Sequence, residues 1–117
     1  MLKTKFRLKK KKEFQFIYKK GEVAFGKDFT IHYVKAYRPY PQIGISVSKQ
    51  VGNSVVRSRV KRIISEACRA ISVEKFAIKN YVITAKPTIA DKKTPEITRE
   101  LTRVLKKNNL LKEEQGV

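Results

Sequence analysis

Two neighbouring patterns in the middle of the chain constrain its fold more than any other feature. Residues 42–48, QIGISVS, alternate large apolar side chains with small ones, which predicts a strand with one apolar face. From residue 53 to residue 71, apolar side chains recur every three or four positions, which predicts a helix with one buried stripe. The stripe consists of Val56, Val60, Ile63, Ile64, Ala67 and Ile71. A strand that leads into a long amphipathic helix requires a fold in which helices pack on a sheet.

Similar periodicities predict the remaining elements. They place a helix at residues 12–20, strands at 22–27, 29–37 and 81–86, and a last helix that begins near Thr94. The predicted order is therefore α-β-β-β-α-β-α. This order is typical of an α+β fold, here a small α/β sandwich with helices on one face of the sheet.

Residues at the ends of the predicted helices agree with these boundaries. Gly21 stands where a glycine commonly follows the end of a helix. Asn53 can cap the long helix with its side chain. Thr94 is expected to cap the last helix, with Pro95 at the first helical position and Glu96 in the first turn.

The net charge is the most unusual property of the composition. The 117 residues include 28 Lys and Arg against 10 Asp and Glu, which gives a formal charge of +18. Repulsion between so many like charges destabilises a folded state, so a polyanionic partner is expected. No stretch approaches the roughly 20 apolar residues of a membrane span, and no secretory signal is recognisable at the N-terminus. Nucleic acid is therefore the expected partner class, and no membrane contact is expected.

Cysteine content fits a reducing compartment. Cys68 is the only cysteine, so no internal disulfide can form. Together with the missing signal segment, this predicts a cytoplasmic protein.

The two ends of the chain differ from its middle. Residues 1–12 hold seven Lys or Arg and no acid, so we expect a flexible basic arm, either a solvated tail or an arm that orders on nucleic acid. Its candidate RNA contacts are Arg7, Lys9 and Lys10. Residues 13–110 are expected to form a single RNA-binding domain, and residues 111–117 a frayed tail.

The start of the long helix carries cations where a helix favours anions. Arg57 and Arg59 lie in its first turns, although a helix N-terminus carries a partial positive charge. Stability alone would favour Asp or Glu there. The arrangement suits phosphate binding, because exposed backbone N–H groups and bidentate guanidinium groups can hold the same anion. The alternative is a solvated basic face.

This region also carries a family signature. The stretch GISVSKQVGNSVVRSRVKRIISEA resembles the motif of the bacterial ribonuclease P protein subunit, in which G-N-A-V leads into R-N-R-x-K-R. RLKKKKEFQFIYKKG is similar to the first helix of that family, and NYVITAKP to its last strand. One position departs from the pattern, since Ser58 stands where the family has the central Asn.

The resemblance implies a function and a topology. Members of that family bind a catalytic RNA and help it remove the 5′ leader of precursor tRNA. Their βαβ crossover through the motif helix is left-handed. The motif helix is implied to contact the catalytic RNA. On this helix the corresponding residues are Arg57, Ser58, Arg59, Lys61, Arg62 and Arg69. Ribonuclease P RNA and precursor tRNA are the implied partners, with no protein partner and a monomeric chain.

A second surface is implied for the single-stranded leader. Aromatic platforms in a positive groove bind single strands, and Phe14 and Tyr18 share one face of the first helix. His32 falls at a strand position that is aromatic in the family, and an imidazole can also stack on a base. The candidate cleft residues are Phe14, Tyr18, His32, Ser46, Ser48, Lys49 and Asn53. The alternative for the aromatic pair is a place in the core.

The sequence contains no recognisable catalytic set. A protein nuclease needs an acid–base pair or a metal cluster, but the chain has one His, one Cys and no paired acids at ligand spacing. We therefore expect no catalytic residue, metal site or cofactor in the protein, with Mg²⁺ bound in the holoenzyme through the RNA. A ribosomal or other structural RNA-binding protein is the second hypothesis, and a self-sufficient nuclease the third.

Overall fold

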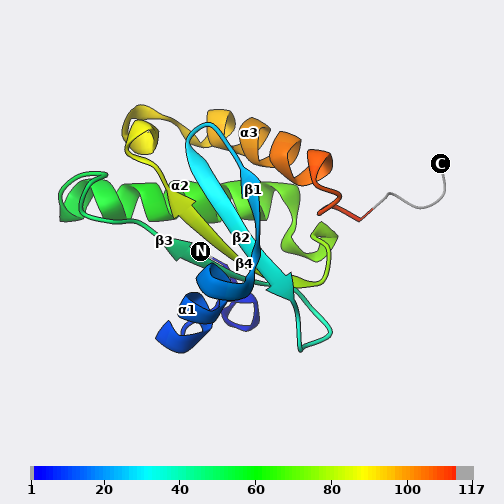
Figure 1. Ribbon diagram of the computed structural model, residues 1–117. Helices are drawn as coiled ribbons and strands as arrows, with labels where there is room; N and C mark the ends of the chain where they lie inside the picture. Colours follow the sequence, from blue (N-terminus) through cyan, green and yellow to red (C-terminus); the bar gives the residue numbers. More distant parts are fainter. Residues whose placement is uncertain (1, 113–117) are drawn as a thin grey trace.

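One four-stranded mixed sheet organises the chain, of which the computed structural model describes residues 2–112 (Figure 1). The strands are β1 (Glu22–Phe25), β2 (Phe29–Lys35), β3 (Gln42–Ser46) and β4 (Lys79–Ala85), and they lie in the order β1-β2-β4-β3. β2 pairs antiparallel with β1 and β4, whereas β3 pairs parallel with β4. A parallel pair needs a long crossover connection, which here contains α2.

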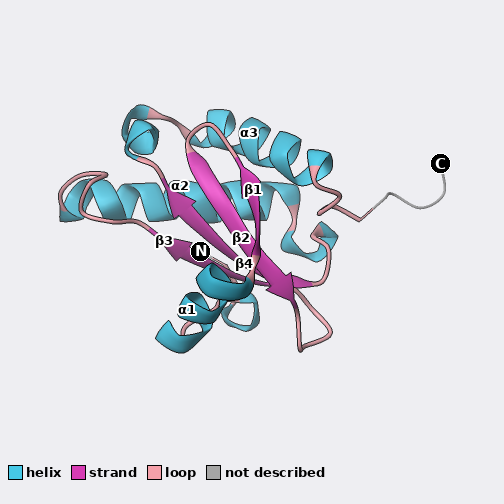
Figure 2. Cartoon of the chain, in the orientation of Figure 1, coloured by secondary structure: helices cyan, strands magenta, loops and turns pink. Residues whose placement is uncertain are grey.

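Within residues 2–112, three α-helices pack on the two faces of this sheet (Figure 2). They are α1 (Lys11–Lys20), α2 (Ser54–Ile71) and α3 (Thr94–Lys107). Short 3₁₀ turns occupy Thr4–Phe6, Val73–Lys75 and Pro87–Asp91. The α+β class and the order α-β-β-β-α-β-α are confirmed, and the strand predicted at residues 22–27 is present as Glu22–Phe25.

The main core lies between the sheet and the pair α2 and α3. Alternate residues of the strands point toward these two helices and are buried, among them Phe29, Ile31 and Ile83. The stripe predicted on α2 faces them, with Val60 and Ile64 fully buried. Leu101 and Leu105 of α3 complete the same core.

The first helix packs on the opposite face of the sheet, so the expectation that the helices share one face is wrong. Ile17 of α1 is buried with Val82 of β4 and Leu8 in a separate, smaller cluster. Its neighbours Phe14 and Val34 are partly buried against that cluster. A short helix cannot cover a four-stranded sheet, so part of this face stays uncovered.

A glycine brings α1 close to the sheet. The ring of Phe14 lies on Gly44 of β3, where a Cβ atom would come within 2.4 Å of the ring. The lack of a side chain at this position therefore makes room for Phe14.

Gly21 has a different role from the expected one. Its φ is −80°, so it does not end α1 in the left-handed conformation. A Cβ atom there would lie 2.5 Å from the carbonyl oxygen of Ile17 and 2.8 Å from that of Tyr33. Close approach of two backbone segments, rather than a positive φ, requires this glycine.

Of the caps predicted for the two longer helices, the one on α2 is confirmed and the one on α3 is wrong by one residue. Asn53 caps α2 as predicted, since its Oδ1 accepts a hydrogen bond from the Val56 N–H at 3.0 Å. On α3 the cap position belongs to Lys93, whose N–H donates to Glu96 Oε1 at 3.2 Å. Thr94 lies one residue inside the helix, and its hydroxyl donates to Glu66 Oε2.

The N-terminal segment differs from the flexible arm expected for residues 1–12. Leu2, Phe6 and Leu8 are buried. The Leu8 N–H donates to the Ile43 carbonyl of β3 at 3.0 Å, next to an isolated bridge between Arg7 and Ile43. The segment is therefore tied to the edge of the sheet, with its basic side chains exposed.

At the other end, part of the tail expected to fray is paired. Leu111 forms a bridge with Phe76, and the Lys112 N–H donates to the Lys75 carbonyl at 2.7 Å. Residues 113–117 of that predicted tail lie outside the described part of the chain. Among residues 2–112, no helix combines the length and apolar character that crossing a bilayer demands.

The contact between Phe14 and Gly44 gives a prediction about stability. Gly44→Ala should lower the free energy of unfolding by about 1–3 kcal/mol, because the new methyl group displaces a packed ring. Urea unfolding followed by circular dichroism measures this loss. In a Phe14→Ala background the same substitution should cost less than about 0.5 kcal/mol, since the ring is gone. An equal loss of stability in both backgrounds would show that the contact between Phe14 and Gly44 is not its cause.

Candidate nucleic-acid interface

The first candidate surface is the basic face of α2, defined as Arg57, Ser58, Arg59, Lys61, Arg62 and Arg69. Five of these six residues are exposed, and Arg57 is half-buried. The helix forms because its apolar stripe is buried against the sheet and α3, which leaves the cations on the outer side. Ser58, Arg59 and Arg62 line a shallow depression of about 590 Å³ together with Ser54 and Val55.

Few acidic groups within the described residues neutralise this face. Glu66 is one turn away from Arg62, yet its carboxylate accepts a hydrogen bond from Thr94, and no ion pair joins it to Arg62 in residues 2–112. Arg59 donates to the backbone carbonyl of Ala90. The Nε atom of Arg57 is buried and has no hydrogen-bond partner in the described structure. A positive field therefore remains at the start of α2, where the helix dipole adds to it.

The second candidate surface is the uncovered part of the sheet beside α1. Tyr18 of α1 leans over it, 40% exposed, and its hydroxyl lies 2.8 Å from Thr84 Oγ1 of β4. The ring of Tyr18 meets His32 of β2 edge to face, with centroids 4.9 Å apart. We call Tyr18, His32 and Thr84 the cleft cluster. The three side chains come from three elements and meet only in the folded chain.

The environment of His32 favours its neutral form. Partial burial lowers the pKa of His32 below its usual value. Its Nδ1 atom is buried and has no hydrogen-bond partner among residues 2–112. A neutral imidazole beside an aromatic ring is suited to stacking on a base.

The other predicted cleft residues lie at different depths. Phe14 is partly buried on Gly44 and so acts first as a packing residue. Ser46 is half-buried at the end of β3, in register with Thr84. Ser48, Lys49 and Asn53 are exposed in and after the loop that leads from β3 to α2. These residues connect the cleft cluster to the start of α2.

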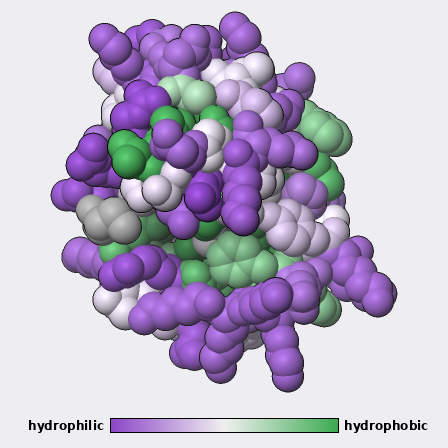
Figure 3. Space-filling view, turned by 90° about the vertical axis from the view of Figure 1, so that its left-hand side faces the viewer, coloured by the Kyte–Doolittle hydropathy of each residue, from purple (hydrophilic) through white to green (hydrophobic). Residues whose placement is uncertain are grey.

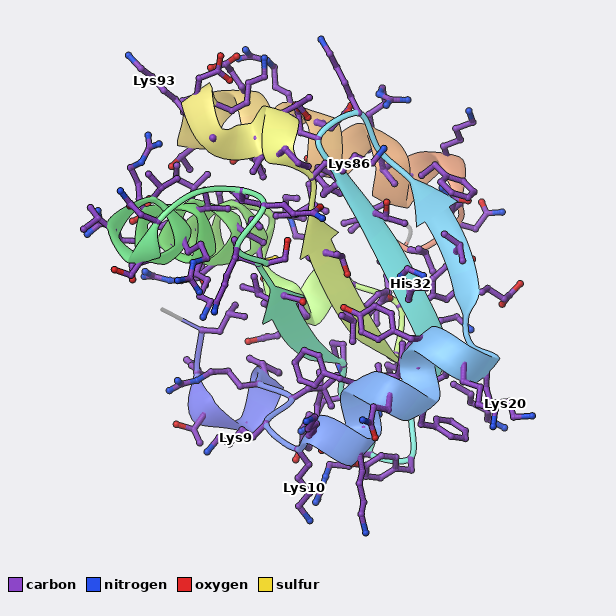
Figure 4. The ribbon with its side chains drawn as sticks, turned by 60° about the vertical axis from the view of Figure 1, so that its left-hand side comes forward. Lys9, Lys10, Lys20, His32, Lys86 and Lys93 are labelled. Atoms are coloured by element: carbon purple, nitrogen blue, oxygen red, sulfur yellow. The ribbon has the colours of Figure 1, made fainter. Side chains whose placement is uncertain are left out.

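The surface view agrees with this arrangement. Figure 3 shows a band of apolar surface on this side of the molecule, bordered above and below by hydrophilic side chains. Arg7, Lys9 and Lys10 are exposed on the segment that precedes α1. Figure 4 shows Lys9 and Lys10 at one end of α1 and Lys20 at the other, with His32 on the sheet above the helix.

Two residues of this surface, Thr84 and Thr30, were not predicted from the sequence. Thr84 and Thr30 lie on the same face of the sheet as His32, because they occupy alternate positions of β4 and β2. The alternation of YVITA could have placed Thr84 on the face opposite Tyr81 and Ile83. It could not have shown that β4 lies beside β2.

Three findings describe the metal-ligating and nucleophilic side chains of residues 2–112. Within residues 2–112 no three His, Cys, Asp or Glu side chains lie close enough to hold a metal ion. Burial raises the pKa of Cys68 to about 12, so its thiol stays protonated and cannot serve as a nucleophile. The His32 ring meets the ring of Tyr18, whose hydroxyl lies 2.8 Å from Thr84 Oγ1.

Comparison with known proteins gives consistent results. The sequence model described as Ribonuclease P matches residues 2–109. The ribonuclease P protein component of Bacillus cereus (strain 03BB102) is 36% identical over 110 residues, which cover 93% of this chain and 96% of that protein. The protein of the same name from Geobacillus sp. (strain WCH70) is 37% identical and covers 95% of this chain and 97% of its own length.

Solved structures agree with the fold. The Staphylococcus aureus RNase P protein superposes with a TM-score of 0.82 at 32% identity and covers 91% of this chain and 97% of that one. The Thermotoga maritima RNase P protein shares the fold, with a TM-score of 0.77 at 21% identity, over 86% of this chain and 96% of that one. The chain belongs to the ribonuclease P protein family, whose members are the protein subunits of an endoribonuclease that removes the 5′ leader from precursor tRNA.

Proposed function

We propose that this chain, as a single RNA-binding domain, uses two separate surfaces in ribonuclease P. The basic face of α2 holds the ribonuclease P RNA, and the cleft cluster holds the single-stranded 5′ leader of precursor tRNA. The observation that carries the proposal is the uncovered part of the sheet, where Tyr18, His32 and Thr84 meet beside a basic helix start.

The basic face of α2 suits an RNA backbone. Arg59 and Arg62 line one depression near the helix start, so their guanidinium groups can bind neighbouring phosphates bidentately. The Nε–H of Arg57 is a buried donor without a partner among residues 2–112, so a phosphate oxygen can satisfy it once the side chain turns outward. Ser58 offers a hydroxyl in the same depression, where the family motif has an amide.

The cleft suits a single strand. The Tyr18 ring is held by its hydroxyl contact with Thr84, which leaves a ring face available for a base to stack on. His32 contributes a second ring. Lys49 and Asn53, exposed at the end of the cleft nearest α2, can bind the backbone phosphates of the same strand.

The chemistry belongs to the RNA subunit in this proposal. Mg²⁺ is proposed to bind in the holoenzyme through the RNA. The chain binds and positions the precursor tRNA as a monomer, in the cytoplasm, without another protein.

A reconstitution assay tests the function. Addition of this chain to a bacterial ribonuclease P RNA at low Mg²⁺ should increase leader removal from precursor tRNA, because the cations of the protein offset phosphate repulsion that Mg²⁺ otherwise screens. The protein without RNA should leave the substrate intact. No gain over the RNA alone would refute the proposal, and cleavage by RNA-free protein would favour a self-sufficient nuclease.

Paired variants test whether the two surfaces are separate. Arg62→Ala should weaken binding to the ribonuclease P RNA by about tenfold, through loss of a charged hydrogen bond, and should leave leader affinity within about twofold of wild type. Arg99→Ala removes the same charge from α3, away from the basic face of α2, and serves as its control.

On the other surface, Tyr18→Ala should weaken leader binding by about tenfold, since one stacked base is lost. Tyr18→Phe keeps the ring and should retain most of the affinity. Binding of both RNAs is measured by fluorescence anisotropy with labelled RNA. Equal losses for both RNAs in Arg62→Ala and Tyr18→Ala would contradict two separate surfaces.

A further inference from the structure

Phe25 is an exposed aromatic side chain that the proposed surfaces do not include. It lies on β1, at the edge of the sheet, and 75% of its surface is exposed. An exposed apolar side chain on an edge strand favours unwanted strand pairing and aggregation. A single exposed apolar residue is common in folded proteins. The surroundings of Phe25 therefore decide whether a function can be assigned to it.

The strand register places Phe25 on the same face as the cleft cluster. Val23 pairs with His32 and Phe25 pairs with Thr30, while Ala24 between them is buried toward α2 and α3. Thr30 in turn pairs with Thr84, whose hydroxyl is hydrogen-bonded to that of Tyr18. One row of side chains therefore crosses the uncovered face, and it consists of Phe25, Thr30, Thr84 and Ser46.

The character of this row fits a nucleic acid strand. Thr30, Thr84 and Ser46 are small, polar and only half-buried, so they leave a shallow floor between Phe25 and the start of α2. Lys27 is exposed beside Phe25, and Lys86 lies at the end of β4, where its Nζ donates to the Gly26 carbonyl at 2.8 Å. Figure 4 shows Lys86 and Lys20 on opposite sides of His32. Two cations, the exposed Lys27 and the half-buried Lys86, thus accompany the aromatic side chain.

We propose that Phe25 is a further stacking position, which extends the leader-binding cleft across β2 to β1. Phe25 lies one strand over from His32 and two residues along, a diagonal of roughly 7–8 Å between such positions. That is about twice the rise of roughly 3.4 Å between stacked nucleotides of one strand. The ring of Tyr18 lies beside His32, with centroids 4.9 Å apart. Phe25 and Tyr18 therefore contact different bases of the same strand.

The position of Phe25 also fixes which part of the leader it contacts. β1 and β3 are the two opposite edges of the sheet, and β3 leads to α2. Because the basic face of α2 is assigned to the catalytic RNA, which cleaves the substrate in the proposed function, Phe25 lies on the side of the cleft away from that RNA. It binds a leader base farther upstream than the base on Tyr18. This inference rests on the proposed function of the cleft.

A leader-length series tests the proposal. Precursor tRNAs whose leaders are shortened one nucleotide at a time are bound to the reconstituted holoenzyme, and Kd is measured for wild type, Phe25→Ala and Tyr18→Ala. Phe25→Ala should weaken binding of long leaders by at least about fivefold and should have no effect once the leader is too short to reach β1. Tyr18→Ala should still weaken binding of those shorter leaders.

Three further variants identify the interaction. Phe25→Tyr keeps the aromatic face and should retain wild-type affinity, whereas Phe25→Leu keeps apolar bulk and should lose as much as Phe25→Ala. Phe16→Ala removes an aromatic residue of α1 that is 56% exposed and absent from the row, and it should bind like wild type. Circular dichroism verifies that each variant is folded.

Each result that contradicts the proposal contradicts a different part of it. A Phe25→Ala loss that is independent of leader length, an equal loss in Phe16→Ala, or full affinity in Phe25→Leu overturns the stacking role of Phe25. Wild-type affinity of Phe25→Ala at every length, with a loss in Tyr18→Ala, overturns the extension and keeps the cleft. A holoenzyme in which Tyr18→Ala also has no effect contradicts the proposed cleft itself.

Discussion

The ring of Phe14 lies on Gly44, and this contact determines where α1 crosses the sheet. Ile17 then covers Val82, and Tyr18 reaches Thr84 without covering the residues beyond it. The other face of the sheet is closed by two longer helices. This unequal coverage leaves one strip of the sheet uncovered, and the candidate leader cleft lies along that strip.

The residues that stabilise α2 are different from those that carry its positive charge. The buried stripe and the Asn53 cap stabilise the helix, so the outer face is free to carry cations. Arg57 and Arg59 in the first turns are unfavourable to the helix dipole, and no acid in that turn offsets them. The same cations become favourable when a phosphate occupies the helix start. The β3–α2 connection places the start of α2 next to the candidate cleft. If both surfaces bind RNA as proposed, one protein holds two RNA strands side by side.

Local patterns predicted most of the fold because each element carries its own periodicity. The stripe of α2 and the alternation in β3 are examples, and the Asn53 cap followed from one residue type at one position. The packed N-terminal segment was missed because Lys3, Lys5 and Arg7 lie between its apolar residues, so charge concealed an apolar pattern. The ring that fills the space over Gly44 comes from another element, as does the backbone that crowds Gly21. The contribution of Thr84 depends on the strand order β1-β2-β4-β3, which no local pattern contains.

The most direct test of the uncovered sheet as a single-strand site is an NMR titration of isotopically labelled protein with a single-stranded RNA oligonucleotide. The structure predicts that the largest chemical-shift changes occur at Tyr18, His32 and Thr84, with the signals of α3 unchanged. Changes confined to the groove between α2 and α3, lined by Ala70, Thr98 and Thr102, would show that the single strand binds elsewhere and would contradict the assignment.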